Sequence, residues 1–432
     1  IKVYQLARDQ TVDGKQFKAG KAYIVPTRQP QYRMVQSAFE TYEEYTDSVY
    51  YDASAWSLVN FYNLPYAATT VDASGKEITS VVSKSSTPER SGYAYILPWT
   101  DYNAPGALYA LQSAGVITTS AFKPFSNSGG SFGYGTVVIP VGRQLISKDS
   151  LYNTIKNVAD QWKVTFKSVE TGYSTTGIDL GSGNLRVLQK PKAIMLVGEG
   201  VNSYEQGEVW HLLDTRVRMP VTKLPIRNFA RADLFKYNVM VLVSGSYSQL
   251  DSVAIESIKT WLKAGNTLVT TRTASRWAIK KGLAKEELIK EEKDSATNVR
   301  RLNYVDAREY IGRKQVGGAI FEVDLDITHP LGFGYTRRTL PVYRNSNVWL
   351  KPSKNPYSTV AKYTEDPHID GFITRENLET YLKPSASLLV SKTGRGRVVL
   401  FADNPNFRGS WYGTNKLFLN ALFLGQHITV PE

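Results

Sequence analysis

Three short polar segments of this sequence carry the side chains best suited to bind a ligand or to take part in catalysis. Each follows an apolar run of strand length, and they comprise residues 198–200, 271–276 and 403–408. Ligands bind beyond the carboxyl ends of parallel strands, and arginine side chains match carboxylates bidentately. We therefore interpret these segments as a candidate cleft for a carboxylate-bearing ligand, with the members Glu199, Arg272, Ser275, Arg276, Asp403, Asn404 and Arg408. The alternative for residues 403–408 is structural, because Asp, Asn and Pro are typical of a loop between a strand and a helix.

Covalent catalysis has few candidates here. The chain has no cysteine, which excludes thiolate nucleophiles, disulfides and thiolate metal sites. Thr273 and Ser275 are hydroxyls in the turn of residues 271–276, but a hydroxyl nucleophile needs a closely placed base. No histidine lies near this turn in the sequence. A serine or threonine hydrolase remains an alternative to a turn kept for packing.

The four histidines do not form a metal motif. His211 and Asp214, with the distant His329, only superficially match the H-x-x-E plus His spacing of a zinc peptidase, because Asp replaces Glu. His368 and His427 are interpreted as surface or hydrogen-bonded residues. The segment 198–200 lacks the third glycine of a dinucleotide fingerprint, since Ser203 occupies that position. We expect no metal and no cofactor in this chain.

Composition indicates a globular protein with a basic surface. The chain has 432 residues, and 52 Lys+Arg against 39 Asp+Glu give a net charge of +13. The basic residues are scattered and no nucleic-acid-binding motif occurs, so no specific nucleic-acid partner is expected. No apolar run reaches the length of a membrane span. The chain opens without methionine or a signal segment, and we interpret it as a mature product or a piece of a longer protein.

The elements that must position these residues alternate between strands and helices. Strands are predicted over residues 93–97, 135–141, 193–197, 239–243, 266–271 and 398–402, and helices over 104–114, 149–162, 205–213, 252–264 and 415–423. Such alternation predicts mostly parallel sheets covered by helices. Residues 126–135 and 171–183 are predicted loops. The boundaries divide the chain into a mixed N-terminal segment, 1–90, a small α/β domain, 91–188, and a larger domain, 189–432.

Several of these segments resemble a known family. Residues 192–198, 261–270, 396–408 and 413–422 are similar to a class I glutamine amidotransferase-like domain, in the version at the C-terminal end of large bacterial zinc carboxypeptidase (carboxypeptidase A-like) proteins. Residues 25–33 and 95–99 resemble the middle of the same proteins. The resemblance implies a flavodoxin-like, three-layer α/β C-terminal domain preceded by a second α/β or α+β region. The amidotransferase cysteine would lie in the turn of residues 271–276, where it is missing.

The resemblance also implies a function. The peptidase domain and its zinc would lie N-terminal to Ile1, and the protein would be secreted or periplasmic. This chain would then be a non-catalytic accessory region that supports the peptidase domain of the same polypeptide or presents peptides to it. The alternative is a stand-alone protein that binds peptides or glycans, because aromatic clusters such as residues 42–51 and 99–102 would suit stacking on an exposed face.

Overall fold

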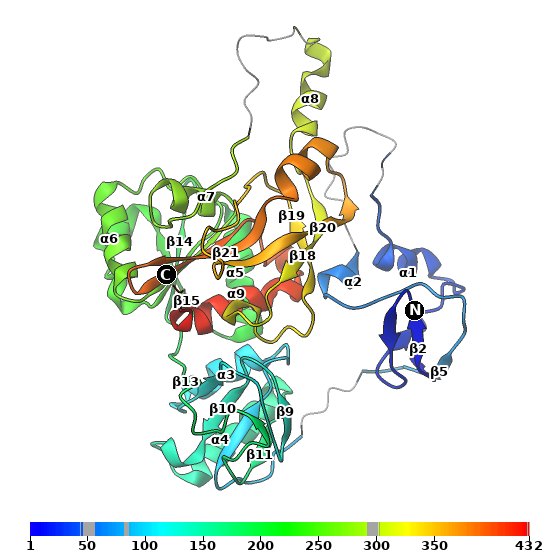
Figure 1. Ribbon diagram of the computed structural model, residues 1–432, viewed down its shortest axis with the longest axis vertical. Helices are drawn as coiled ribbons and strands as arrows, with labels where there is room; N and C mark the ends of the chain where they lie inside the picture. Colours follow the sequence, from blue (N-terminus) through cyan, green and yellow to red (C-terminus); the bar gives the residue numbers. More distant parts are fainter. Residues whose placement is uncertain are drawn as a thin grey trace.

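The computed structural model describes residues 1–43, 45, 57–81, 86–291, 301, 303–429 and 431. Figure 1 shows an N-terminal part at the right, a middle part at the bottom and a large C-terminal part in the centre. Most of the aromatic segment 42–51 and part of the predicted boundary before residue 91 lie outside the described residues. No helix in the described ranges has the length and apolar character needed to cross a membrane.

The N-terminal part consists of short strands that pair antiparallel. β1 lies between β4 and β5, and β2 pairs with β3. The backbone N–H of Tyr42 donates to Asp370 Oδ1 at 2.8 Å, which attaches this part to the large sheet. The elements are β1 (Tyr4–Leu6), β2 (Gln10–Val12), β3 (Lys15–Phe17), β4 (Tyr23–Ile24), α1 (Tyr32–Phe39), α2 (Leu58–Phe61) and β5 (Ser74–Glu77).

The middle part is an antiparallel sheet with two helices. Its strand order is β11-β6-β10-β7-β13, and every neighbouring pair is antiparallel. The helix α4 begins at Ser147, whose side chain accepts a hydrogen bond from Ser150 N. The elements are β6 (Ala94–Leu97), α3 (Ala104–Ser113), β7 (Thr119–Ala121), β8 (Phe125–Asn127), β9 (Gly130–Phe132), β10 (Val137–Pro140), α4 (Lys148–Trp162), β11 (Lys167–Val169), β12 (Thr176–Gly177) and β13 (Leu185–Val187).

The prediction of a mostly parallel sheet is therefore wrong for the middle part. Between β6 and β10 the chain forms α3 and then the extra strand β7. The chain reverses its direction once more after β7, so β10 runs antiparallel to both β6 and β7. The sequence Thr119-Ser120-Ala121 has no apolar run, so it gave no strand signal although all three residues are buried. The predicted loop of residues 126–135 likewise contains most of the hairpin β8–β9, and the predicted loop of 171–183 contains β12.

The C-terminal part is one sheet of nine strands in the order β15-β14-β16-β17-β22-β21-β20-β18-β19. The first five strands are parallel, and the remaining pairs are antiparallel. The elements are β14 (Ala193–Val197), α5 (Ser203–His211), β15 (Val221–Pro225), β16 (Val239–Leu242), α6 (Ser252–Lys263), β17 (Thr267–Thr271), α7 (Thr273–Lys280), α8 (Ala307–Arg313), β18 (Ala319–Leu325), β19 (Thr339–Arg344), β20 (Thr359–Gly371), β21 (Ala386–Thr393), β22 (Gly396–Phe401) and α9 (Tyr412–Leu424).

The parallel strands confirm the strand predictions for residues 193–197, 239–243, 266–271 and 398–402. The connection from β14 to β15 runs toward one edge of the sheet, and the connection from β16 to β17 runs the other way. Because crossovers are right-handed, α5 and α6 cover opposite faces. The antiparallel strands between residues 319 and 393 were not predicted. The chain is thus a mixed α/β protein with a large sheet.

Helix α9 holds the parts together. It is buried on all sides from Thr414 to Leu424, although it contains Lys416 and Asn420. Asn420 Oδ1 accepts from Trp99 Nε1 at 2.8 Å, and its Nδ2 donates to the carbonyls of Leu331 and Phe333 at 2.7 and 2.8 Å. Lys416 Nζ donates to the carbonyls of Trp99 and Asp101. One cluster of buried apolar side chains accordingly runs through both the middle and the C-terminal parts.

Replacing Asn420 is expected to destabilise the protein strongly. Asn420→Ala leaves the buried Trp99 N–H and two buried carbonyls without partners, and each such group costs about 1–3 kcal/mol. We expect the free energy of unfolding, measured by urea denaturation, to fall by about 3 kcal/mol or more. Asn153→Ala, on the exposed face of α4, is the matched control and should change it by less than about 0.5 kcal/mol. Equal effects of the two substitutions would contradict the role given to Asn420.

Candidate functional site

The turn between β17 and α7 has the backbone of a strained elbow. Arg272 connects the two elements with φ 49° and ψ −117°, a left-handed φ that costs a non-glycine residue roughly 1–3 kcal/mol. Its backbone N–H donates to the carbonyl of Phe401 at 2.8 Å, which fixes the turn against the end of β22. The predicted strand-to-helix turn is therefore present, and Arg272 occupies its apex.

The side chain of Arg272 pairs with a carboxylate that the sequence analysis did not select. Its Nη1 lies 2.5 Å from Oε1 of Glu205, and its Nη2 donates to the carbonyl of Asn345 at 2.7 Å. Glu205, only 3% exposed, also accepts from Ser244 N at 2.9 Å and from Thr271 Oγ1 at 3.1 Å. One carboxylate on α5 thus connects the carboxyl ends of β16 and β17.

Glu199, the predicted acidic member of the cleft, lies elsewhere. It is exposed in the loop between β14 and α5. The carboxylate that meets Arg272 comes six residues later, in the first turn of α5, where Asn202 caps the helix by accepting from Glu205 N. An Asn followed by Glu three residues later is the spacing of a helix start. That spacing locates the helix, but it does not reveal which way the glutamate points.

The hydroxyls of the turn are used for packing. Ser275 is fully buried, and its Oγ donates to the carbonyl of Phe401 at 2.8 Å and lies 2.9 Å from Thr270 Oγ1. Thr273 Oγ1 accepts from Gly245 N at 2.9 Å. Arg276 donates to the carbonyl of Asn347 at 2.6 Å, two residues beyond the Asn345 carbonyl that accepts from Arg272. The contacts of Ser275 and Arg276 therefore attach the elbow to neighbouring segments of the chain.

Asp403 belongs to a separate buried network. Its carboxylate lies 3.0 Å from Arg344 Nη1 and accepts from Ser387 Oγ at 2.6 Å and from Tyr363 Oη at 3.0 Å. Burial raises the pKa of Asp403 above its ordinary value, while Arg344 opposes the shift. These partners lie on β19, β20 and β21, so Asp403 connects β22 to the antiparallel half of the sheet.

Asn404 and Arg408 meet a second glutamate, one turn after Glu205 on α5. Glu208 accepts from Asn404 Nδ2 and from the backbone N–H of Arg408, both at 2.6 Å. Burial raises the pKa of Glu208 to about 7, and the nearby charge of Glu205 adds to the shift. Arg408 also has a positive φ of 53°, which presents its backbone N–H to this carboxylate. Glu208 was not predicted as a site residue.

Tyr343 lies beside this cluster. Its ring stacks on Phe407 with centroids 3.8 Å apart, and its hydroxyl is buried without a hydrogen-bond partner among the described residues. Burial raises its pKa to about 12, while the charges of Arg408 and Arg272 oppose the shift. The structure therefore assembles Arg272, Asn404 and Arg408 around two glutamates. Because the pKa of Glu208 lies near 7, this carboxyl group gains or loses its proton close to neutral pH.

Two of the histidines, His329 and His368, contact backbone groups close to them in the sequence. His329 Nδ1 accepts from Leu331 N at 3.1 Å, and burial lowers the pKa of His329 to about 4. His368 Nε2 lies 2.6 Å from the carbonyl of Gly371. Within the described ranges, no three His, Asp or Glu side chains are grouped as a metal site requires.

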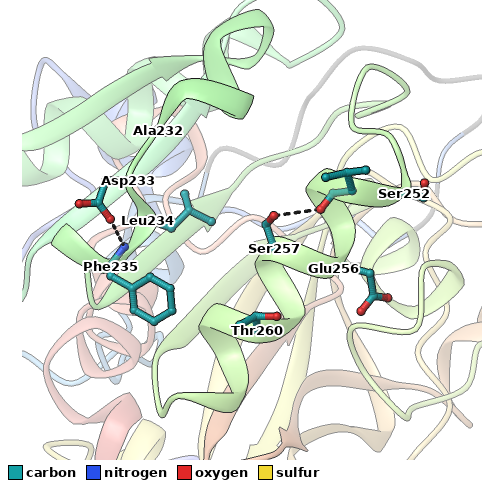
Figure 2. A pocket seen from close by; sticks show the side chains of 9 residues that line it. Ala232, Asp233, Leu234, Phe235, Ser252, Glu256, Ser257 and Thr260 are labelled. Carbon is teal, nitrogen blue, oxygen red and sulfur yellow. Dashed lines mark hydrogen bonds between the residues drawn. The ribbon is translucent and has the colours of Figure 1, made fainter.

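A shallow groove lies away from the glutamate cluster, between the turn at residues 232–235 and the outer face of α6 (Figure 2). Leu234, Phe235 and Val253 provide its apolar surface. Two of its polar side chains form hydrogen bonds with nearby backbone groups: Asp233 Oδ1 accepts from Phe235 N, and Ser257 Oγ donates to the carbonyl of Val253. None of the predicted site residues lines it.

Comparison with known proteins leaves the family open. No protein-family model matches the chain, and no curated protein matches it. Among solved structures, it is similar to ThuA-like proteins from Parabacteroides merdae and Bacteroides uniformis, with 12% and 11% identity and TM-scores of 0.35 and 0.34. These matches cover 54% and 53% of this chain, and 88% and 89% of the other chains. A β-galactosidase from Bacillus circulans sp. alkalophilus has 10% identity and a TM-score of 0.29, over 76% of this chain and 48% of the enzyme. Likeness at this level carries no argument about function.

Removing the Arg272 side chain is expected to destabilise the protein. Arg272→Ala leaves the buried Glu205 carboxylate without its counter-charge, a change that typically costs about 3–5 kcal/mol. Arg276→Ala is the matched control, because it removes an arginine from the same turn whose guanidinium donates to a backbone carbonyl and pairs with no carboxylate of the described residues. Urea denaturation should show the larger loss for Arg272→Ala, and Glu205→Gln should restore part of it in the double variant. A loss no larger than that of the control would contradict the ion-pair interpretation.

Glu208 is expected to make stability fall as pH rises. Its folded pKa, about 7, lies above the ordinary value of 4.5, so between these values the folded state binds more protons than the unfolded state. The free energy of unfolding should therefore decrease from pH 4.5 to about pH 7 relative to Glu208→Gln, by about 2 kcal/mol after screening by solvent. Thermal unfolding of both proteins across this range measures the difference. The exposed Glu199→Gln serves as control, and a pH-independent difference between wild type and Glu208→Gln would disprove the assignment.

Proposed function

We propose that this chain is a non-catalytic accessory region, in which an amidotransferase-like domain has replaced its nucleophile with a buried ion pair. The observation that carries the proposal is Arg272 at the apex of the elbow, with φ 49° and its guanidinium on Glu205. An amidotransferase needs a cysteine at such a turn, where backbone N–H groups and a helix N-terminus stabilise the thiolate and the oxyanion. A guanidinium cannot act as a nucleophile.

The layout of the C-terminal part supports the amidotransferase-like, flavodoxin-like assignment. Five parallel strands with α5 and α6 on opposite faces form a three-layer unit, and the elbow lies at the carboxyl end of a central strand. The antiparallel strands β18 to β21 extend this unit on one side. The sequence resemblance of residues 396–408 and 413–422 to the same domain type agrees with this layout.

A serine or threonine hydrolase is the weaker alternative. Ser275 is 0% exposed and already donates its proton to the carbonyl of Phe401. Thr273 Oγ1 accepts from Gly245 N at 2.9 Å, so this hydroxyl already has a backbone partner. Both contacts favour a turn whose hydroxyls stabilise it.

The accessory role follows from the resemblance to zinc carboxypeptidase-like proteins. In this proposal the catalytic zinc is held by a peptidase domain of the same secreted or periplasmic polypeptide, outside this chain. The region described here supports that domain or presents peptides to it. Its rigid elbow, fixed by the Glu205 contacts, would serve as a scaffold.

The deciding experiment is to read the coding sequence upstream of Ile1 and measure the intact mass of the natural protein. We expect a domain with H-x-x-E and a distant His, still attached in the mature protein. The whole protein should then release C-terminal residues from peptides in a zinc-dependent assay, with unchanged kcat for Arg276→Ala. A gene that begins close to Ile1, or an intact protein without peptidase activity, would overturn the accessory role.

A further inference from the structure

Three tyrosines from distant parts of the chain gather at the N-terminal end of α9. Tyr62 follows α2, Tyr102 lies between β6 and α3, and Tyr412 is the first residue of α9. The ring centroids of Tyr62 and Tyr412 lie 4.9 Å apart, and those of Tyr102 and Tyr412 lie 6.0 Å apart. Tyr62 and Tyr102 remain 50% and 38% exposed. With Arg216, described next, they form what we call the tyrosine platform.

Arg216 adds a free positive charge to the platform. It lies in the π-helical segment Leu212–Val217 that follows α5, and its Nη2 donates to Tyr412 Oη at 2.9 Å. Its guanidinium carbon also lies 5.1 Å from the centroid of the same ring. In the described part of the chain no carboxylate pairs with Arg216, which is exposed. Arginine has five N–H donors, so most of its hydrogen-bonding capacity faces solvent while the ring fixes its position.

Holding the parts of the chain together does not require the exposed residues of the platform. That contact is made underneath, where Phe61 and Trp411 pack with centroids 4.9 Å apart and are 3% and 1% exposed. Asn415 fixes Tyr102 by a contact of 3.1 Å with its hydroxyl. Tyr62 and Tyr102 keep 50% and 38% of their surface in solvent, so burial of apolar surface does not account for their exposed part.

We propose that the tyrosine platform binds a carboxylate-bearing saccharide, such as an oligosaccharide of uronic acid. Tyr62 and Tyr102 are the exposed rings of the platform; aromatic rings can stack on the apolar C–H faces of pyranose rings, and phenol hydroxyls can exchange hydrogen bonds with sugar hydroxyls. The guanidinium of Arg216 matches the carboxylate of the uronic acid as a planar fork. This ligand site goes beyond the accessory role and does not depend on it.

An acidic peptide fits the platform less well. Two modes of peptide recognition are relevant: an extended peptide adds a strand to an exposed sheet edge, and an acidic motif binds a cluster of arginines, whereas the platform has a single arginine. The platform consists of residues from helices and loops, and no strand of the described chain contributes to it. The platform therefore offers stacking on tyrosine rings and one guanidinium, that of Arg216. These interactions favour a ring-shaped, hydroxylated ligand.

Isothermal titration of the whole chain with trigalacturonate tests the proposal. We expect saturable binding that weakens with added salt, because the carboxylate–guanidinium contact is exposed. Arg216→Gln and Tyr62→Ala should each weaken it by about tenfold, since each removes one of the principal contacts. Tyr62→Phe keeps the ring and should stay within about twofold of wild type. Arg143→Gln and Tyr173→Ala, exposed residues of the middle part, are matched controls and should bind as wild type does.

Several outcomes would overturn the saccharide site. These are no saturation at millimolar trigalacturonate, equal losses in the control and platform variants, or binding of neutral maltotriose as tight as that of trigalacturonate. Tighter binding of triglutamate than of trigalacturonate would also overturn it and favour a peptide. Thermal unfolding of each variant shows whether it is folded. If Tyr62→Ala does not fold, the comparison of Arg216→Gln with its control Arg143→Gln still decides the question.

Discussion

The carboxylate of Glu205 is the contact on which the candidate site depends. It neutralises Arg272, and it accepts hydrogen bonds from the ends of two neighbouring strands. A buried carboxylate is costly unless it is paired and fully hydrogen-bonded, and here three donors meet that requirement. The same contacts hold Arg272 in a left-handed φ that a non-glycine residue otherwise avoids. The turn thus has the backbone of an elbow, and the side chain at its apex, Arg272, pairs with the buried Glu205.

Two glutamates one helical turn apart have different roles because their surroundings differ. Glu205 lies against a guanidinium, whereas Glu208 is partly buried against an amide and a backbone N–H. Neutral donors compensate the loss of hydration less well than a full positive charge does. The pKa of Glu208 is therefore raised to about 7, where half of these side chains carry a proton. Since α5 carries both residues, any displacement of that helix would change both environments together.

The sequence predicted the parallel half of the sheet better than the antiparallel half. Strands such as β14 and β16 are buried on both faces and consist of continuous apolar runs, which are easy to recognise. Strand β20 contains Glu365, Asp366, Pro367 and His368, and its register shifts against both neighbours, so neither composition nor alternation marks it as a strand. For the site, Arg272 and Asn404 were predicted, but the partners of Arg276 and Asp403 come from loops and strands far along the chain. Spacing within a segment cannot reveal such partners.

Helix α9 gives the chain an unusual order of assembly. The hydrogen bond between Trp99 and Asn420 joins residues 321 positions apart, and the contact between Lys416 and Asp101 spans 315. During synthesis the middle part leaves the ribosome long before α9 exists, so the face that carries Trp99 stays in contact with water until the last helix is made. Contacts of such sequence separation slow folding, and an uncovered apolar face invites association with other chains. The nascent chain therefore passes through an interval in which α9 is not yet present to cover that face.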